Sequence, residues 1–89
     1  MSKEIHIKNI EDALKNNQND YNGKFIGEEL LKVLKIARNE KKYNELTDTS
    51  IIENLFRDES ILGTSSIDYL KSIYNKAIHD FQWSFYCHG

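Results

Sequence analysis

The middle of the chain repeats apolar and polar residues with a period close to that of an α-helix. At 100° per residue, a set of apolar side chains falls within one sector and basic side chains gather on the opposite side. One face would be buried and the other solvated. The pattern therefore predicts a helix over residues 27–43. The apolar set is Ile26, Leu30, Val33, Leu34 and Ala37, and the basic set is Lys32, Lys35, Arg38 and Lys42.

Three other stretches show helical spacing together with start signals. Asn9 is suited to cap a helix over residues 9–17, and Ser50 with Glu53 matches the Ser-x-x-Glu capping box of a helix beginning near residue 50. No proline interrupts any of them. We therefore expect an all-α fold, a compact four-helix domain. The last helix would be capped by Ser65 or Ser66 and bury Ile67, Leu70, Ile73, Tyr74, Ala77, Ile78 and Phe81.

Both ends of the chain also permit a short strand. Ile5 and Ile7 alternate with polar residues within residues 3–8, and residues 81–87 are rich in aromatic residues that favour strands. A short pairing of these terminal segments is an alternative to helix there.

The chain resembles itself when it is shifted by forty positions, which brings Gly23 onto Gly63. Two helix-loop-helix units, residues 9–43 and 50–86, would then pack together within a single domain of residues 1–89. The alternative is that two amphipathic helices match by chance, because both need apolar residues at the same period.

Composition and charge narrow the classes of partner. Of 89 residues, 39% are hydrophobic and 29% are charged, and the formal net charge is -2. This length suits one hydrophobic core, and the weak negative charge makes nucleic acid an unfavourable partner. With one cysteine, no apolar signal region and no apolar run of membrane-spanning length, we expect a cytoplasmic protein with no membrane partner.

Residues 18–29 match much of a calcium-binding loop. Such a loop needs clustered oxygen ligands, a glycine at its sharp turn and a final glutamate that supplies two oxygens. The chain has Gln18 at the first position, where the pattern has an acidic ligand. The residues that fit are Asp20, Asn22, Gly23, Lys24 through its backbone carbonyl, and Glu29.

On these residues the segment resembles the EF-hand family, in which a twelve-residue loop joins two helices. The resemblance implies at most vestigial calcium binding, with calcium as the one cofactor to consider. It also implies a clamp that grips an amphipathic helix of a partner protein, as in pairs that have lost the metal. A plain Asn22-Gly23 turn between two helices is the alternative.

The last helix offers residues for contact with a partner. Tyr69, Lys76 and Trp83 recur every seven residues on the side opposite the predicted core stripe, with His79 and Tyr86 beside them. Exposed aromatic residues at such spacing are typical of binding hot spots. The alternative is that the helix ends before Trp83 and the tail folds back over the core.

The second half of the chain is acidic, especially around the third predicted helix. Clustered carboxylates can steer a basic partner surface. They are Glu45, Asp48, Glu53, Asp58 and Glu59.

Nothing in the sequence matches a catalytic signature. Cys87 and the three histidines lack the spacing of a zinc site, and the four glycines form no phosphate-binding loop. We therefore predict a non-enzymatic, protein-binding regulatory module that clamps or occludes a partner. One alternative is a small microbial or phage inhibitor or immunity-type protein that blocks a toxin or enzyme. The other is a helix-turn-helix DNA-binding regulator, although its reading helix, residues 66–80, contains no arginine.

Overall fold

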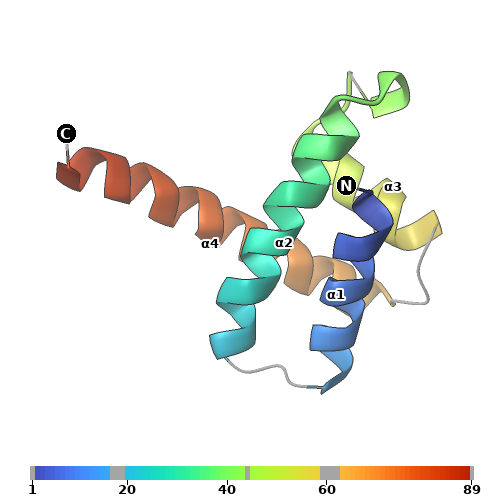
Figure 1. Cartoon of the computed structure of the whole chain (residues 1–89), viewed down its shortest axis with the longest axis horizontal. Coiled ribbons are helices and arrows are strands. Elements are labelled where there is room, and N and C mark those ends of the chain that lie inside the picture. Colours follow the sequence, from blue (N-terminus) through green and yellow to red (C-terminus); the bar gives the residue numbers. More distant parts are fainter. Residues whose placement is uncertain (1, 17–19, 44, 59–62, 89) are drawn as a thin grey trace.

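Four α-helices and one short 3-10 helix make up the part of the chain that the structure describes (Figure 1). The computed structural model describes residues 2–16, 20–43, 45–58 and 63–88, and within these ranges all side chains except those at 20–22, 41, 58 and 81–88. The predicted all-α four-helix domain is confirmed. The elements are α1 (Lys3–Asn16), α2 (Asp20–Arg38), the 3-10 helix η1 (Lys41–Tyr43), α3 (Asp48–Asp58) and α4 (Thr64–His88).

The described residues contain no strand, so the alternative of a strand pairing between the termini is wrong. Residues 3–8 are helical because the side chains that reach the core, His6, Ile7 and Ile10, follow helical spacing. Ile5, the other half of the apparent alternation, is 54% exposed. At the other end, α4 continues to His88, so the alternative of a tail folding back before Trp83 is also wrong.

The predicted bounds of the second helix are displaced. α2 begins at Asp20 and ends at Arg38, where the sequence predicted residues 27–43. The chain then forms a tight turn with hydrogen bonds between residues three apart. The Asn39 amide donates to the Ile36 carbonyl (3.1 Å), and the Glu40 amide donates to the Ala37 carbonyl (3.0 Å). This turn lets Tyr43 pack into the core, where it is 7% exposed.

Different residues from those predicted start the third and fourth helices. Thr47 caps α3, since its Oγ1 accepts from the Ser50 amide (3.2 Å) and its carbonyl accepts from the Ile51 amide (2.9 Å). The carbonyl of Gly63 accepts from the amides of Ser66 (3.0 Å) and Ile67 (3.2 Å) at the start of α4. The predicted Ser50–Glu53 capping box is therefore wrong, because Ser50 already lies inside the first turn.

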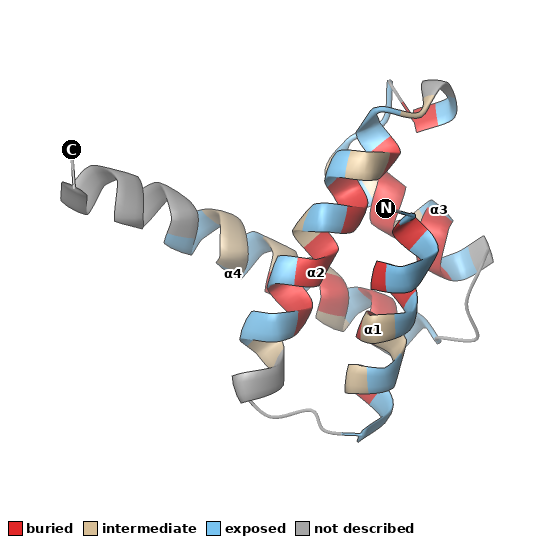
Figure 2. Cartoon of the chain, in the orientation of Figure 1, coloured by how far each residue is buried: buried red, intermediate tan, exposed pale blue. Residues whose placement is uncertain are grey.

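α2 is the central helix of the molecule. It packs against α1, α3 and α4, and α3 packs in turn against the first half of α4. The buried residues of each helix face this common interior (Figure 2). The later turns of α4 extend beyond the other helices (Figure 1). The fully buried side chains include Phe56, Ile10, Ile26, Leu30, Leu34, Ile51, Ile52, Leu55, Leu70 and Val33.

Candidate protein-binding groove

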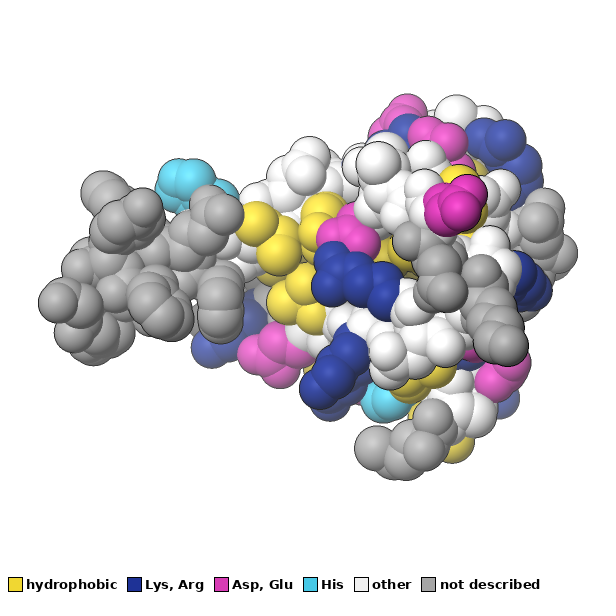
Figure 3. Space-filling model, turned by 90° about the horizontal axis from the view of Figure 1, so that it is seen from above, with side chains coloured by type: hydrophobic (Ala, Val, Ile, Leu, Met, Phe, Trp, Pro, Cys, Tyr) yellow, Lys and Arg dark blue, Asp and Glu magenta, His cyan; other side chains and the backbone are white. Residues whose placement is uncertain are grey.

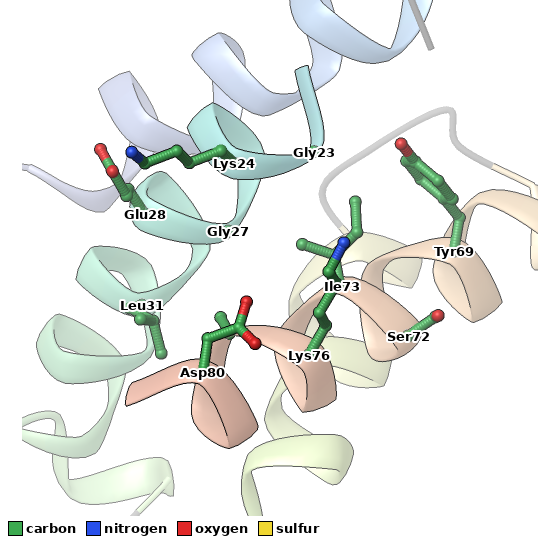
Figure 4. A pocket seen from close by; sticks show the side chains of 11 residues that line it. Gly23, Lys24, Gly27, Glu28, Leu31, Tyr69, Ser72, Ile73, Lys76 and Asp80 are labelled. Atoms are coloured by element: carbon green, nitrogen blue, oxygen red, sulfur yellow. The ribbon is translucent and has the colours of Figure 1, made fainter. Parts of the chain in front are cut away.

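A groove of about 980 Å³ runs between the first half of α2 and the middle of α4 (Figure 4). It lies between the two predicted helix-loop-helix units, since α2 belongs to one and α4 to the other. Apolar and small residues line it together with exposed charged residues, the rim residues. It is lined by Gly23, Lys24, Gly27, Glu28, Leu31, Tyr69, Ser72, Ile73, Lys76, Ala77 and Asp80.

The two glycines of α2 have different roles in the groove. A Cβ on Gly27 would lie 3.3 Å from Ile73 Cγ2 and 3.5 Å from Ala77 Cβ, so glycine lets α2 and α4 approach closely there. A Cβ on Gly23 would meet nothing within 4 Å, and neither glycine has a positive φ. Because Gly23 has no side chain, it leaves open space beside α2, one helical turn before the contact with α4 at Gly27.

Four charged residues are among the lining residues, Lys24 and Glu28 on α2 and Lys76 and Asp80 on α4, and all are exposed. In Figure 4 the side chains of Lys24 and Glu28 lie on the side of α2 away from α4. Among the described residues, none forms an ion pair with Lys24, Glu28 or Lys76. Charged side chains of both signs are also interspersed on the face seen in Figure 3. Lys24, Glu28 and Lys76 are thus available to a second molecule.

The structure brings together two of the predicted contact residues of α4. Tyr69 and Lys76 both line the groove, although Tyr69 is half-buried and packs against the core. The prediction that they lie opposite the core side is therefore wrong for Tyr69. His79 is exposed outside the groove, with Nδ1 3.6 Å from Asp80 Oδ1. The side chains of Trp83 and Tyr86 lie outside the described residues.

Fewer of the predicted acidic residues are free to contact a partner than the sequence suggests. Glu53 pairs with Lys71 of α4, and Asp48 is held inside the fold, which leaves Glu45 exposed. The side chain of Asp58 and all of Glu59 lie outside the described residues. Two of the five predicted carboxylates therefore hold α3 against its neighbours, where the sequence predicted contacts with a partner.

Asp48 is the centre of a cluster that joins three helices. Its carboxylate accepts hydrogen bonds from Arg38 of α2, with Nε at 2.8 Å, and from the hydroxyl of Tyr74 of α4. Burial opposes the ionisation of Asp48, but the bonds from Arg38 and Tyr74 outweigh it and lower its pKa. Burial and the bond to the Asp48 carboxylate raise the pKa of Tyr74 to about 12.

Glu29, the predicted final calcium ligand, is buried between α1 and α2. Its Oε2 lies 2.6 Å from His6 Nδ1, and its Oε1 accepts a hydrogen bond of 3.0 Å from Asn9 Nδ2. Lys32 Nζ is 3.6 Å from Oε2. Burial disfavours the charge, but the bonds from Asn9 and His6, together with the charges of His6 and Lys32, lower the pKa of Glu29.

Of residues 18–29, which match much of a calcium-binding loop, those from Asp20 onward form the first turns of α2. Packing of Ile26 and Gly27 against the core overrides the turn preference of the Asn22-Gly23 pair. Lys24 is exposed on the groove, and the side chains of Asp20 and Asn22 lie outside the described residues. No cluster of three or more His, Cys, Asp or Glu suited to a metal occurs among the described residues. Calcium binding remains a prediction.

The sequence prediction missed most of the groove. It treated Gly27, Ile73 and Ala77 as helix starts or core residues, and it singled out neither Glu28 nor Asp80 for a partner. Gly27, between the buried Ile26 and Leu30, was the available signal, because a glycine inside a helix permits the close approach of another helix.

Comparison with protein-family models, curated proteins and solved structures finds no match to this chain. Within the described residues, no helix combines the length and apolar character needed to cross a membrane.

Proposed function

We propose that this chain is a non-enzymatic protein-binding module that grips a helix of a partner protein in the groove between α2 and α4. The observation that carries the proposal is the groove itself, which is lined by apolar, small and charged residues and has open space at Gly23. Binding there would cover the partner's apolar face, so the module acts by clamping and occlusion.

The size and lining of the groove support a helix as the bound element. Ile73, Ala77 and Leu31 offer apolar contacts, and Tyr69 offers an aromatic side chain with a polar tip, a residue type enriched in binding hot spots. A helix presents apolar residues at positions i and i+4 to such a surface, while its polar residues meet the rim.

The two alternative functions, an inhibitor of a toxin or enzyme and a DNA-binding regulator, gain less support from the described contacts. A basic enzyme or toxin would need the acidic residues near α3, yet Asp48 and Glu53 are engaged within the fold. A DNA-reading α4 would need several free cations, yet of its two lysines Lys71 is bound by Glu53, which leaves Lys76.

The test is a selection from a displayed library of helical peptides, followed by affinity measurements on two variants. Gly23→Phe fills open space in the groove, and Gly63→Phe is the matched control, because a Cβ there also meets nothing within 4 Å and the residue does not line the groove.

We expect selected peptides to lose about tenfold or more in affinity for Gly23→Phe and to keep their affinity for Gly63→Phe. Equal affinity for the two variants, or a selection that yields no binder, would overturn the proposal. Circular dichroism of both variants checks that each remains folded.

A further inference from the structure

The last turns of α4 lie apart from the rest of the molecule. α4 continues to His88, and its final turns extend beyond the other helices (Figure 1). Residues 81–88 include four aromatic residues and no Asp, Glu, Lys or Arg. About two turns of helix without tertiary packing are marginal in water, and aromatic side chains gain stability when they are buried. Packing against a second molecule would therefore stabilise this end of α4.

The groove side of α4 and its projecting end share one stripe of the helix. Some of the lining residues of α4 are spaced alternately by four and three residues, and the same spacing continues to the last turn. At 100° per residue, all positions of this series fall within one sector of the helix. Alternate spacing of this kind is typical of the a and d positions of a coiled coil, where two helices meet. The series is Tyr69, Ile73, Lys76, Asp80, Trp83 and Cys87.

Two copies of this stripe are complementary when they pair antiparallel about a two-fold axis. With the axis at the level of Ile78, Lys76 of each copy lies opposite Asp80 of the other, which gives two pairs of opposite charge. Within the described residues, Lys76 has no ion pair of its own. The same register brings Trp83 of each copy opposite Ile73 of the other, because both pairs of positions are centred on residue 78. Charged and apolar positions thus select one register.

We propose that the helix held in the groove is the C-terminal end of α4 of a second copy of this chain. Two chains then form a symmetric dimer in which each supplies Trp83 to the groove of the other. This inference rests on the proposed function and names its partner. The incoming helix lies along α4, and the open space at Gly23 accommodates the large indole near Ile73. Each contact is made twice, because the two halves of such an interface are identical.

The experiment measures the oligomeric state of the full chain by sedimentation velocity at several concentrations, together with the emission of its single tryptophan. We expect a dimer with blue-shifted emission that shifts to the red as dilution dissociates it. Trp83→Ala should weaken the dimer by about a hundredfold or more, because each dimer loses two aromatic anchors. Phe85→Ala is the matched control, since helical spacing puts position 85 on the opposite side of α4, and it should leave the dimer unchanged.

An exchange of charge between copies tests the register. Lys76→Glu and Asp80→Lys each place like charges opposite one another twice per dimer, so each alone should weaken self-association by about tenfold or more. An equimolar mixture of the two variants restores opposite charges in both pairs and should form a heterodimer with the affinity of the parent. An effect on folding within one chain would not be rescued by mixing. The rescue should weaken in high salt, because salt screens exposed charges.

Three results would overturn the inference. They are a full chain that remains monomeric at about 0.1 mM, a dimer that Trp83→Ala or Gly23→Phe leaves intact, and a mixture of charge variants that fails to recover. Circular dichroism checks that every variant is folded. Should a charge variant not fold, the comparison of Trp83→Ala with Phe85→Ala decides the outcome.

The proposed function is tested separately on the Trp83→Ala variant. This variant is expected to be monomeric, so its groove is open to displayed helical peptides. Peptides that bind it and lose affinity when Gly23→Phe is added would support the groove as a helix-binding site, even if the full chain proved monomeric. A selection on this variant that yields no binder would overturn the wider function and restrict the groove to a second copy of the chain.

Discussion

The contribution of a single residue to the stability of this fold depends on the side chains that it contacts. Glu28 and Glu29 are neighbours of the same type on α2, but Glu28 is exposed on the rim of the groove and Glu29 is 6% exposed beside His6 and Asn9. A buried carboxylate that accepts hydrogen bonds is costly to disrupt, whereas an exposed one is not. The two glutamates should therefore respond differently to the same change.

We expect Glu29→Gln to lower the free energy of unfolding at neutral pH by about 2 kcal/mol and Glu28→Gln to change it by less than about 0.5 kcal/mol. Because the pKa of Glu29 is lowered in the folded state, its ionised form stabilises the fold above its ordinary value of 4.5. This stability is lost as the pH falls below 4.5 and through the folded pKa.

Thermal unfolding followed by circular dichroism between pH 7 and pH 3 measures both effects. Parent and Glu28→Gln should lose stability on acidification more steeply than Glu29→Gln. Parallel pH profiles for the parent and Glu29→Gln would contradict the assignment.

The two glycines of α2 lead to a second prediction about single residues. Gly23→Ala should raise the free energy of unfolding by about 0.5 kcal/mol, because alanine favours helix and its Cβ enters open space. Gly27→Ala should stabilise less, or destabilise, because Ile73 Cγ2 would be 3.3 Å from the new Cβ. Urea unfolding of the two variants measures this difference. If the Gly27→Ala variant is the more stable of the two, α2 and α4 do not approach each other as closely as described.

At the scale of elements, polar clusters fix how the helices meet at their ends. Lys3 of α1 is 7% exposed, with Nζ 3.0 Å from a carboxylate oxygen of Glu40, just after α2, and 5.4 Å from the centre of the Tyr43 ring. Asp48 performs a similar role at the start of α3, where it joins Arg38 and Tyr74. These clusters position α1 and α3 along α2, and α2 with α4 forms the groove.

Tyr74 supplies a prediction at alkaline pH. Its folded pKa of about 12 lies above the ordinary value of 10.0, so its neutral hydroxyl stabilises the fold fully below pH 10, and this stability is lost as the pH rises toward 12. Tyr74→Phe removes the bond to Asp48 and should lower stability by about 1 kcal/mol at pH 8. The difference between parent and variant should shrink from pH 10 to 12 in chemical unfolding experiments; a constant difference would exclude this titration.

For the whole molecule, one core gathered around α2 should make unfolding cooperative. Leu34 is 1% exposed in that core, whereas Ile78 is half-buried where α4 leaves the other helices. We expect Leu34→Ala to cost about 2–5 kcal/mol and Ile78→Ala about 1 kcal/mol. Urea unfolding of both variants tests the ranking, and an equal cost would mean that the core extends along α4 past Ala77.

The sequence by itself determined that the chain is all-α and which side chains of α2 are buried. Both follow from local chemistry, since the absence of proline permits long helices and the helical period places Leu30, Val33 and Leu34 on one face. The same reasoning placed Tyr69 and Lys76 opposite the core as candidates for partner contact; both line the groove, but Tyr69 packs against the core, and their contact with a partner stays a prediction.

Only the tertiary structure decided where α2 begins and what Glu29 and Asp48 contact. The Asn22-Gly23 pair favours a turn locally, but packing of the following turns against α1 and α4 makes it helical. The groove likewise depends on how closely two helices distant in sequence cross at Gly27. A local pattern contains no information about that distance, because it is set by side chains packed between elements.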